Sequence, residues 1–569
     1  MSTRDTLERS WLLSSFQFHS QLESLSEFSR REWLAIVVFG GGFTALMLII
    51  ITLIDQSFFY PRMQTDVLLY YLKAKLLAHS GTSSARLAIN LLPYPYASMP
   101  GALRAPLVAL FPGFDNQLRA IQVLNVVIAD ALALMSAYIF SWFLPRSRNW
   151  MAVGFAFGCV LLSPWWLANI FLVMADAPYA AFSLASMIVA IRLVASPRPL
   201  WRPLPILAFA MLFVVAFLFR YTEPIVLVLI VVLLNGRRVG HPIEGRKLLI
   251  ALAGVALCIG ALILANSNAI FGRYMIEPFI LLRGVEKQSM FLNFIALAVP
   301  EQVIPGFALV FSHPPMISVF TAEFAATKMD AAWSIIGVVI TTVVGFGAWR
   351  LRDRLLPELL MLLGVLPLLV VMMPSTSRYF MTYQPFFWIA FYEGVRALAA
   401  RIPSVIRRSI ASRSGLLAGL ALAIGLAGAL LMRGGRARGG AVSRLSRLTS
   451  MSEYTRGYTA TYRPLKQFLD TLPRDRTFLT SASSSLGRWK AISNLDYYAI
   501  DSSITQIATQ KDLFLVIECG SADLCAQEAQ LEAGTKDEFC AVGEFDYQLV
   551  FEARSEKSLA KVYRVRPAP

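Results

Sequence analysis

Long apolar runs separated by short basic segments dominate this chain. Runs close to the length that crosses a bilayer as a helix, about 20 residues, lie near residues 33–54, 117–142, 150–168, 177–195, 247–265, 333–349, 355–373, 380–398 and 415–432. The apolar stretch 204–235 is interrupted at 220–224, which favours two short helices that meet at a polar elbow. The pattern therefore predicts an α-helical polytopic membrane domain over residues 33–432, with about 11 transmembrane helices.

The positions of the basic residues predict how this domain is oriented. Short loops rich in Lys and Arg stay in the cytoplasm. Residues 30–31 precede the first run, and every second loop after it is basic, down to residues 350–354 and 396–413. We therefore expect a cytoplasmic N-terminus, extracytoplasmic loops near 55–110 and 266–332, and an extracytoplasmic C-terminus.

The second long outer loop contains an apolar piece at residues 291–311 that is broken by Pro300 and Pro305. If this piece crossed the membrane, the alternation of basic loops would fail. We expect it to form interfacial or re-entrant helices that line a cavity.

Composition and charge agree with a multi-pass membrane protein. Hydrophobic residues make up 56% of the chain and charged residues 15%, which excludes an ordinary soluble globular protein. The net charge of +16 comes largely from the basic loops. Such loops contact anionic head groups, so membrane lipids are expected partners and nucleic acid is not.

The two ends of the chain have a different composition from the middle. Residues 1–32 are polar and read as a cytoplasmic interfacial segment, while residues 433–454 read as a flexible basic linker. Residues 455–569 have the pattern of a soluble extracytoplasmic α/β domain. Its strand signals lie at 476–481, 512–518, 547–552 and 560–564, and its helix signals at 463–472 and 522–533.

The cysteines divide by location. Cys159 and Cys258 fall in apolar runs and read as small apolar fillers. Cys519, Cys525 and Cys540 fall in the outer domain, where an oxidising compartment permits one disulfide of open pairing. A zinc site is the alternative, but the spacing matches no common zinc pattern and no histidine follows His313.

Asp66 is the first candidate for chemistry. It opens the run from Met63 to Gly81, in which apolar residues recur at helical spacing while Lys73 and Lys75 lie on the other side. We expect an amphipathic helix along the membrane surface. Such a helix would hold the Asp66 carboxylate at the water-facing mouth of the bundle.

Further charged residues occur where runs meet the outer face. Asp176 stands between the third and fourth runs, and Arg378 and Tyr379 stand before the tenth. Taken singly, Asp176 reads as a helix cap, and the Arg-Tyr pair as a headgroup anchor. Together with Asp66 and with Arg220 in the polar elbow, they place several polar groups on one face of one bundle.

The order of these features resembles that of the GT-C glycosyltransferases, within the branch that holds protein O-mannosyltransferases and lipid A aminoarabinose transferases. The residues that carry the resemblance are Asp66, Asp176 with Pro178, Arg220, Arg378 with Tyr379, and Pro385. The mannosyltransferase branch has Asp-Glu in the first outer loop, whereas Val67 follows Asp66 here.

The resemblance implies an inverting transfer of a sugar from a polyprenyl-phosphate donor to an acceptor hydroxyl. Asp66 would then be the general base. The lipid phosphate would be bound by Arg378 and Arg220, assisted by Lys73 and with Tyr379 adjacent.

In the same scheme, Asp176 would position the acceptor or orient a cation, and Glu223 would hold Arg220. No cofactor or metal is required, although a divalent cation could sit between two carboxylates. The acceptor remains open between a glycan, a glycolipid and a protein.

Two other classes compete with this interpretation. A transporter or flippase of lipid-linked glycans would place ionisable residues in the middle of its spans, as at Asp130. A non-catalytic scaffold would use the outer domain to bind a partner. We expect a cell inner (plasma) membrane location for any of the three, with the C-terminal domain in the periplasm.

Overall fold

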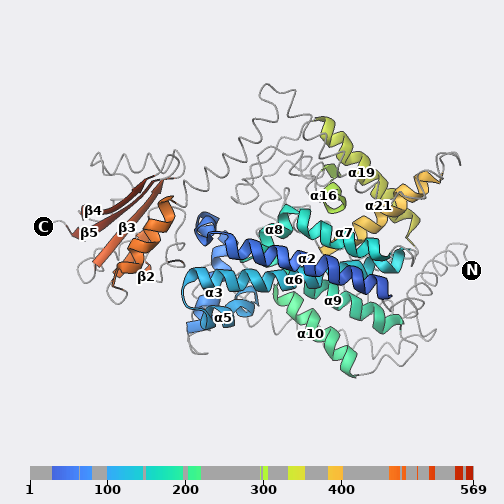
Figure 1. Ribbon diagram of the computed structural model, residues 1–569, viewed down its shortest axis with the longest axis horizontal. Helices are drawn as coiled ribbons and strands as arrows, with labels where there is room; N and C mark the ends of the chain where they lie inside the picture. The colour runs from blue at the N-terminus through green and yellow to red at the C-terminus, as the bar shows by residue number, and fades with distance from the viewer. Residues whose placement is uncertain are drawn as a thin grey trace, which may run out of the picture.

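The computed structural model describes residues 29–62, 65–79, 99–144, 149–195, 203–219, 295–296, 299–304, 331–352, 382–400, 460–473, 477–481, 492, 496–497, 512–519, 545–554 and 559–567. These residues form a helical bundle and a small sheet (Figure 1). The sheet lies beyond the end of the bundle at which the first long helix stops.

The helices of the bundle are α2 (Arg30–Leu53), the 3-10 helix η2 (Gln56–Arg62), α3 (Thr65–His79), α5 (Met99–Leu110), α6 (Phe114–Phe143), α7 (Asn149–Leu162), α8 (Pro164–Phe171), α9 (Asp176–Ala195), α10 (Pro203–Phe219), α16 (Val299–Val303), α19 (Ala331–Arg350) and α21 (Gln384–Ala399). A further helix over residues 460–471 precedes the sheet. We call it the C-terminal helix.

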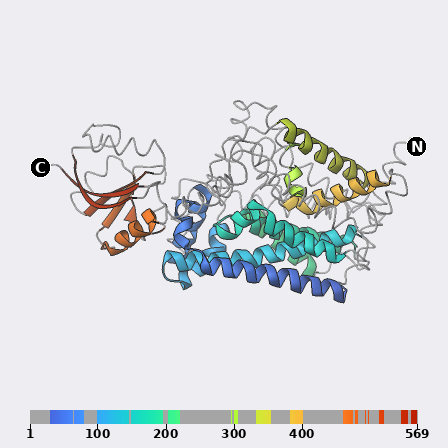
Figure 2. The ribbon, with the colours of Figure 1, turned by 45° about the horizontal axis from the view of Figure 1, so that its top comes forward.

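Two of the described helices, α2 and α6, are long and apolar enough to cross a membrane. At 1.5 Å per residue, the 24 residues of α2 span about 36 Å, which exceeds a hydrocarbon core of about 30 Å. One face of α2 is apolar and exposed, with Val37 and Leu34 among its residues. Figure 2 shows α2 along the edge of the bundle.

The start of α2 is fixed by a capping box. The Ser29 hydroxyl accepts a hydrogen bond from the Glu32 amide, and the Glu32 carboxylate accepts one from the Ser29 amide. This reciprocal pair satisfies two amides that the first helical turn leaves unpaired. The remainder of the expected interfacial segment, residues 1–28, lies outside the described residues.

The predicted runs at 33–54, 117–142, 177–195 and 333–349 are confirmed as helices by α2, α6, α9 and α19. The runs at 247–265, 355–373 and 415–432 lie outside the described residues. Of the two short helices expected over 204–235, the first is α10.

The third predicted run, 150–168, is not one helix. It divides at Ser163 into α7 and α8, and Pro164 begins α8. Proline has no backbone N–H to donate and is favoured in the first turn of a helix. After α8, the non-helical segment 172–175 leads into α9, with the Met174 amide donating to the Leu172 carbonyl oxygen at 3.0 Å.

Helix α6 is the centre of the bundle, in contact with α2, α7, α8, α9 and α21. Aromatic rings join α6, α7 and α21. The Trp388 ring of α21 lies 4.6 Å from that of Phe140 and 4.4 Å from that of Phe155, measured between centroids. Aromatic pairs at this separation add favourable ring contacts to the burial of their apolar surface.

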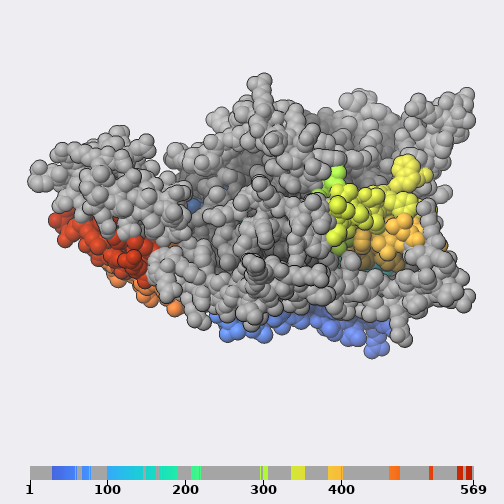
Figure 3. Space-filling model, turned by 90° about the horizontal axis from the view of Figure 1, so that it is seen from above, coloured from blue at the N-terminus to red at the C-terminus, as the bar shows by residue number. Residues whose placement is uncertain are grey.

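Helices α19 and α21 pack against one another through glycines, and Figure 3 shows them side by side in yellow and orange. A Cβ atom on Gly347 would collide with the carbonyl oxygen of Ala390, and one on Gly394 with that of Val343. The two backbones therefore approach more closely than any larger residue would allow.

The C-terminal sheet has the strand order β2-β1-β3-β5-β4, with bounds β1 Thr477–Ser481, β2 Asp496–Tyr497, β3 Asp512–Cys519, β4 Phe545–Arg554 and β5 Leu559–Pro567. The pairs β1–β2 and β1–β3 are parallel, whereas β3–β5 and β5–β4 are antiparallel. The four predicted strands are confirmed, and β2 was not predicted.

The C-terminal helix packs on this sheet. The Phe468 ring stacks on the Phe551 ring of β4, with centroids 4.7 Å apart. The predicted helix at 463–472 is confirmed by the helix over residues 460–471. The predicted helix at 522–533, the linker 433–454 and the cysteines at 525 and 540 lie outside the described residues.

Replacing Gly347 with alanine should separate α19 from α21, because the added methyl group meets backbone and not a movable side chain. We expect a loss of about 1–3 kcal/mol of unfolding free energy, the usual cost of overpacking, seen as a lower melting temperature of the purified protein. Gly345→Ala, in the same helix with nothing within 4 Å of the new Cβ, is the matched control. Equal melting temperatures for the two variants would contradict the close approach.

Candidate functional site

A row of polar side chains on α6 is buried and binds the backbone of the segment before α9. Asn125 donates hydrogen bonds to the carbonyl oxygens of Ile170 and Leu172 at 3.1 and 3.0 Å. Gln122 donates to the carbonyl oxygen of Phe171 at 3.1 Å. These bonds satisfy carbonyls at the end of α8, where the helix leaves acceptors without intrahelical partners.

Arg104 of α5 is completely buried beside this row. Its guanidinium donates to the carbonyl oxygens of Pro100 at 2.8 Å and Met174 at 2.5 Å, and to Oδ1 of Asn125 at 3.3 Å. Burial lowers the pKa of Arg104 to about 10, so the group stays charged at neutral pH. Its Nε atom has no hydrogen-bond partner within the described part of the chain.

Arg104 was not predicted as a site residue from the sequence. It falls in the segment from Met99 to Leu110, which was read as part of an outer loop and not as a helix. A lone arginine within an otherwise apolar helical segment was the available signal, since such a charge needs buried oxygen partners.

Asp176 begins α9 and is buried. The next residue, Ala177, donates its amide hydrogen to Oδ1 of Asn169 at 3.0 Å, which fixes the start of the helix. Asn125, which binds the preceding segment, lies 11 residues into α6, or about 16 Å along it at 1.5 Å per residue. Asp176 is therefore covered by neighbouring elements and does not stand at an open mouth.

Asp66 lies in the first turn of α3, so the predicted helix at this place is confirmed. Tyr71 of the same helix bonds through its hydroxyl to Gln117 of α6. Just before α3, the Tyr60 hydroxyl donates to Asp115 in the first turn of α6 at 2.6 Å. Burial and the Asp115 charge raise the pKa of Tyr60, so this hydroxyl keeps its proton.

The expectation that Lys73 lies on a water-facing side of α3 is wrong. Lys73 is only 2% exposed, because α5 covers this side of the helix. A Cβ on Gly101 of α5 would lie 2.7 Å from that of Lys73, so glycine is what lets the two helices meet there. Burial lowers the pKa of Lys73 to about 8.

The remaining predicted site residues, Arg220, Glu223, Arg378 and Tyr379, lie outside the described residues. Gln384, which begins α21, lies a few residues after the Arg-Tyr pair. It accepts a hydrogen bond from Nε1 of Trp166 in α8 at 3.2 Å. This contact ties the start of α21 to the helix that precedes the Asp176 segment.

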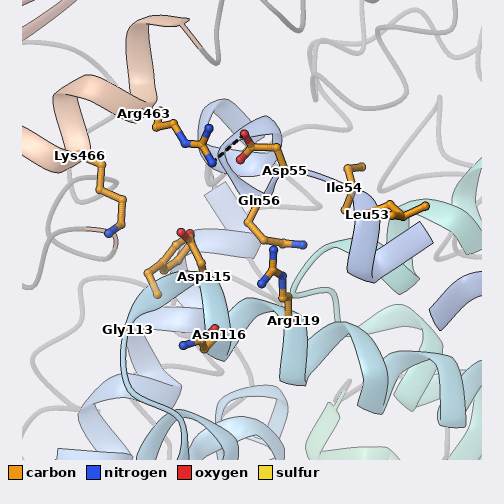
Figure 4. Close-up of a pocket in the computed structure, with 11 residues that line it drawn as sticks. Leu53, Ile54, Asp55, Gln56, Gly113, Asp115, Asn116, Arg119, Arg463 and Lys466 are labelled. Atoms are coloured by element: carbon orange, nitrogen blue, oxygen red, sulfur yellow. Dashed lines mark ion pairs between the residues drawn. The ribbon is translucent and has the colours of Figure 1, made fainter. Parts of the chain in front are cut away.

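A separate, open pocket of about 500 Å³ lies between the bundle and the C-terminal helix (Figure 4). Its charged and amide-bearing lining comprises Asp55, Gln56, Asp115, Asn116, Arg119, Arg463 and Lys466. Gln56 joins it to the buried row, because Gln122 donates to Gln56 Oε1 at 3.0 Å. No single segment of the sequence pointed to this pocket, since its walls come from three distant parts of the chain.

No family model matches this chain, and no curated protein matches it. Within the described ranges, no three side chains of the types that bind metals gather at one place.

Lys73 gives the buried site a pH dependence that can be measured. The unfolded chain keeps the Lys73 proton up to about pH 10.5, whereas the folded chain releases it above about pH 8. The free energy of unfolding should therefore rise between pH 8 and 10.5, relative to a Lys73→Met variant.

Chemical denaturation of both proteins across this pH range checks the sign. Lys466→Met in the C-terminal helix controls for the loss of a lysine elsewhere. The free energy of unfolding is compared between the unchanged chain and Lys73→Met at each pH. A difference that stays constant with pH would show that burial does not shift the pKa of Lys73.

Proposed function

We propose that this chain is a membrane glycosyltransferase that moves a sugar from a polyprenyl phosphate to an acceptor hydroxyl on the outer face of the membrane. The observation that carries the proposal is the position of α5, which contacts both α3 and the segment before α9. Each of these two helices has an acidic residue in its first turn. Gly101 of α5 lies against α3, which has Asp66 in its first turn, and Arg104 of α5 binds the segment that leads to Asp176.

The charge of the buried site supports a phosphate-bearing substrate. Arg104 and Lys73 bring two basic groups into a low-dielectric region, and the Arg104 guanidinium donates its hydrogen bonds to the neutral oxygens of Pro100, Met174 and Asn125. A cation that is not neutralised by a carboxylate stabilises negative charge nearby. In a transfer from a lipid phosphate, such charge develops on the departing phosphate.

The proposed step is a single displacement with inversion. The acceptor oxygen attacks the anomeric carbon while its proton moves to the Asp66 carboxylate. The bond between the anomeric carbon and the phosphate oxygen breaks, and its electron pair leaves on the lipid phosphate. No cofactor is consumed, and a divalent cation is not needed for this balance.

The other roles follow from the resemblance stated above. Arg378, with Tyr379 beside it, and Arg220 bind the phosphate, Glu223 orients Arg220, and Lys73 contributes positive charge from within the bundle. Asp176 orients the acceptor from its buried position. About 11 spans would place these groups on the periplasmic side of a cell inner membrane, together with the C-terminal domain.

The competing function, transport of a lipid-linked glycan, would draw on Asp130 in the middle of α6. That carboxylate accepts a hydrogen bond from the Thr44 hydroxyl of α2 at 2.6 Å. The contact joins two long apolar helices, so it gives Asp130 a structural role without any moving ion.

Asp66→Asn should abolish most of the transfer activity. The amide keeps the size of the side chain but cannot accept the acceptor proton, so turnover should fall on the order of 100-fold or more while donor binding changes little. The measurement uses membranes that contain the full chain, a polyprenyl phosphate carrying a tritiated sugar, and acceptors from a total envelope extract.

Glu552→Gln, an exposed acid on β4, is the matched control. Near-normal turnover in Asp66→Asn would remove the residue from the mechanism and make Asp176 the next base to test.

The proposed orientation is tested separately. A reporter that is active only outside the cytoplasm, fused after Pro569, should be active, because the alternation of basic loops puts the C-terminus outside. A fusion at the same point to a reporter active only in the cytoplasm should be silent. The reverse pair of results would mean that the number of spans is wrong by one, and the proposal of a site on the outer face would fail with it.

A further inference from the structure

The pocket between the bundle and the C-terminal helix has basic groups on both of its walls. Arg119 comes from α6, and Arg463 and Lys466 come from the C-terminal helix (Figure 4). Arg463 makes an ion pair of 3.3 Å with Asp55, and Lys466 makes one of 2.6 Å with Asp470. The guanidinium of Arg119 has no partner among the residues that the structure describes.

The carboxylates of the pocket are already engaged. Asp55 is paired with Arg463 and also accepts hydrogen bonds from the amide and hydroxyl of Ser57 at 3.0 and 2.8 Å. Asp115 accepts from the Tyr60 hydroxyl. Neither carboxylate is paired with Arg119 among the described residues, so the Arg119 guanidinium is available to an anionic ligand.

The start of α6 adds to this preference. Gly113 stands at the N-cap with φ of 79°, and no side chain caps the helix. The amides of the first turn thus lack a side-chain acceptor at the place where Phe114, Asp115 and Asn116 line the pocket. A 30-residue helix presents the positive end of its dipole here.

The pocket also has an apolar lip. Leu53 and Ile54, at the end of α2, line one side of it, opposite Arg463 and Lys466 (Figure 4). Leu53 is 80% exposed and continues the apolar outer face of α2, on which Leu46 and Ile49 are exposed as well. An acyl chain can lie along this face while a polar group enters the pocket.

We propose that the pocket binds the phosphate of an anionic membrane lipid. The phosphate is held by Arg119 of the bundle and by Arg463 and Lys466 of the C-terminal helix, so the lipid links the two parts of the chain. Guanidinium groups match phosphate oxygens through paired hydrogen bonds. A volume of about 500 Å³ falls in the usual range of small-ligand sites, roughly 300–1,000 Å³. This site is distinct from the proposed transfer site, and binding there does not require sugar transfer.

The test uses the full chain, purified in a neutral detergent and titrated with phosphatidylglycerol, phosphatidylcholine or soluble glycerol phosphate. Binding is followed by the rise in melting temperature. Phosphatidylglycerol should stabilise the protein at lower concentration than either of the other two. Equal binding of phosphatidylcholine would refute the need for net negative charge, and equal binding of glycerol phosphate would refute a lipid.

Two substitutions of opposite expected sign make the assignment specific to the pocket. Arg119→Gln should weaken phosphatidylglycerol binding about tenfold, as expected for loss of a charge-assisted hydrogen bond. Asp115→Asn should strengthen binding, because it removes a negative charge from the pocket and still accepts from Tyr60. Arg566→Gln, an exposed change on β5, should leave binding unaltered.

A second readout tests the link between the two parts. Phosphatidylglycerol should slow amide hydrogen exchange in the C-terminal helix of the unchanged chain and not in Arg119→Gln. Unchanged affinity in both pocket variants, or slowed exchange that persists in Arg119→Gln, would overturn the proposal.

Discussion

The bundle is built around one buried cation that cannot be left without oxygen partners. Arg104 is inside the protein, and a guanidinium taken out of water costs free energy unless hydrogen bonds replace its hydration. The carbonyls of Pro100 and Met174 and the amide of Asn125 do so. Because these acceptors belong to α5, to α6 and to the segment before α9, the requirement of one side chain fixes three elements together.

Polar contacts lead from Arg104 to the surface of the protein. Asn125 binds the end of α8, Gln122 binds both Phe171 and Gln56, and Gln56 lines the outer pocket. There the ion pair between Asp55 and Arg463 reaches the C-terminal helix. The buried site and the outer pocket are thus two ends of one connected polar network, and a change at Gln56 touches both.

Hydropathy predicted the long helices well, because a run such as α2 has one physical reason to exist, the removal of apolar surface from water. The hydropathy pattern failed where the burial of a side chain is decided by contact with another segment. Lys73 was placed on a polar face from the pattern of α3 alone, but α5 covers that face. Arg104 was missed because α5, only 12 residues long, is too short to read as a span.

The site residues show the same limit. The position of Asp66 at the start of a helix could be predicted from local spacing, and so could a helix start at Asp176. The burial of Asp176 could not, since burial depends on segments that meet only in three dimensions. The pocket was wholly unpredictable from local pattern, because Asp55, Arg119 and Arg463 meet only in three dimensions.

The two ends of the polar network differ in how they hold positive charge. Arg104 is buried, so water screens its charge only weakly. An anion that approaches it must lose its hydration before it gains the electrostatic attraction. Arg119 is exposed, and salt screens it. The affinity of the pocket for an anion must therefore come from several basic groups together, which include Arg463 and Lys466 on the C-terminal helix. A buried cation would therefore suit the transient charge of the proposed transfer, whereas a group of exposed cations would suit the proposed lipid, which stays bound.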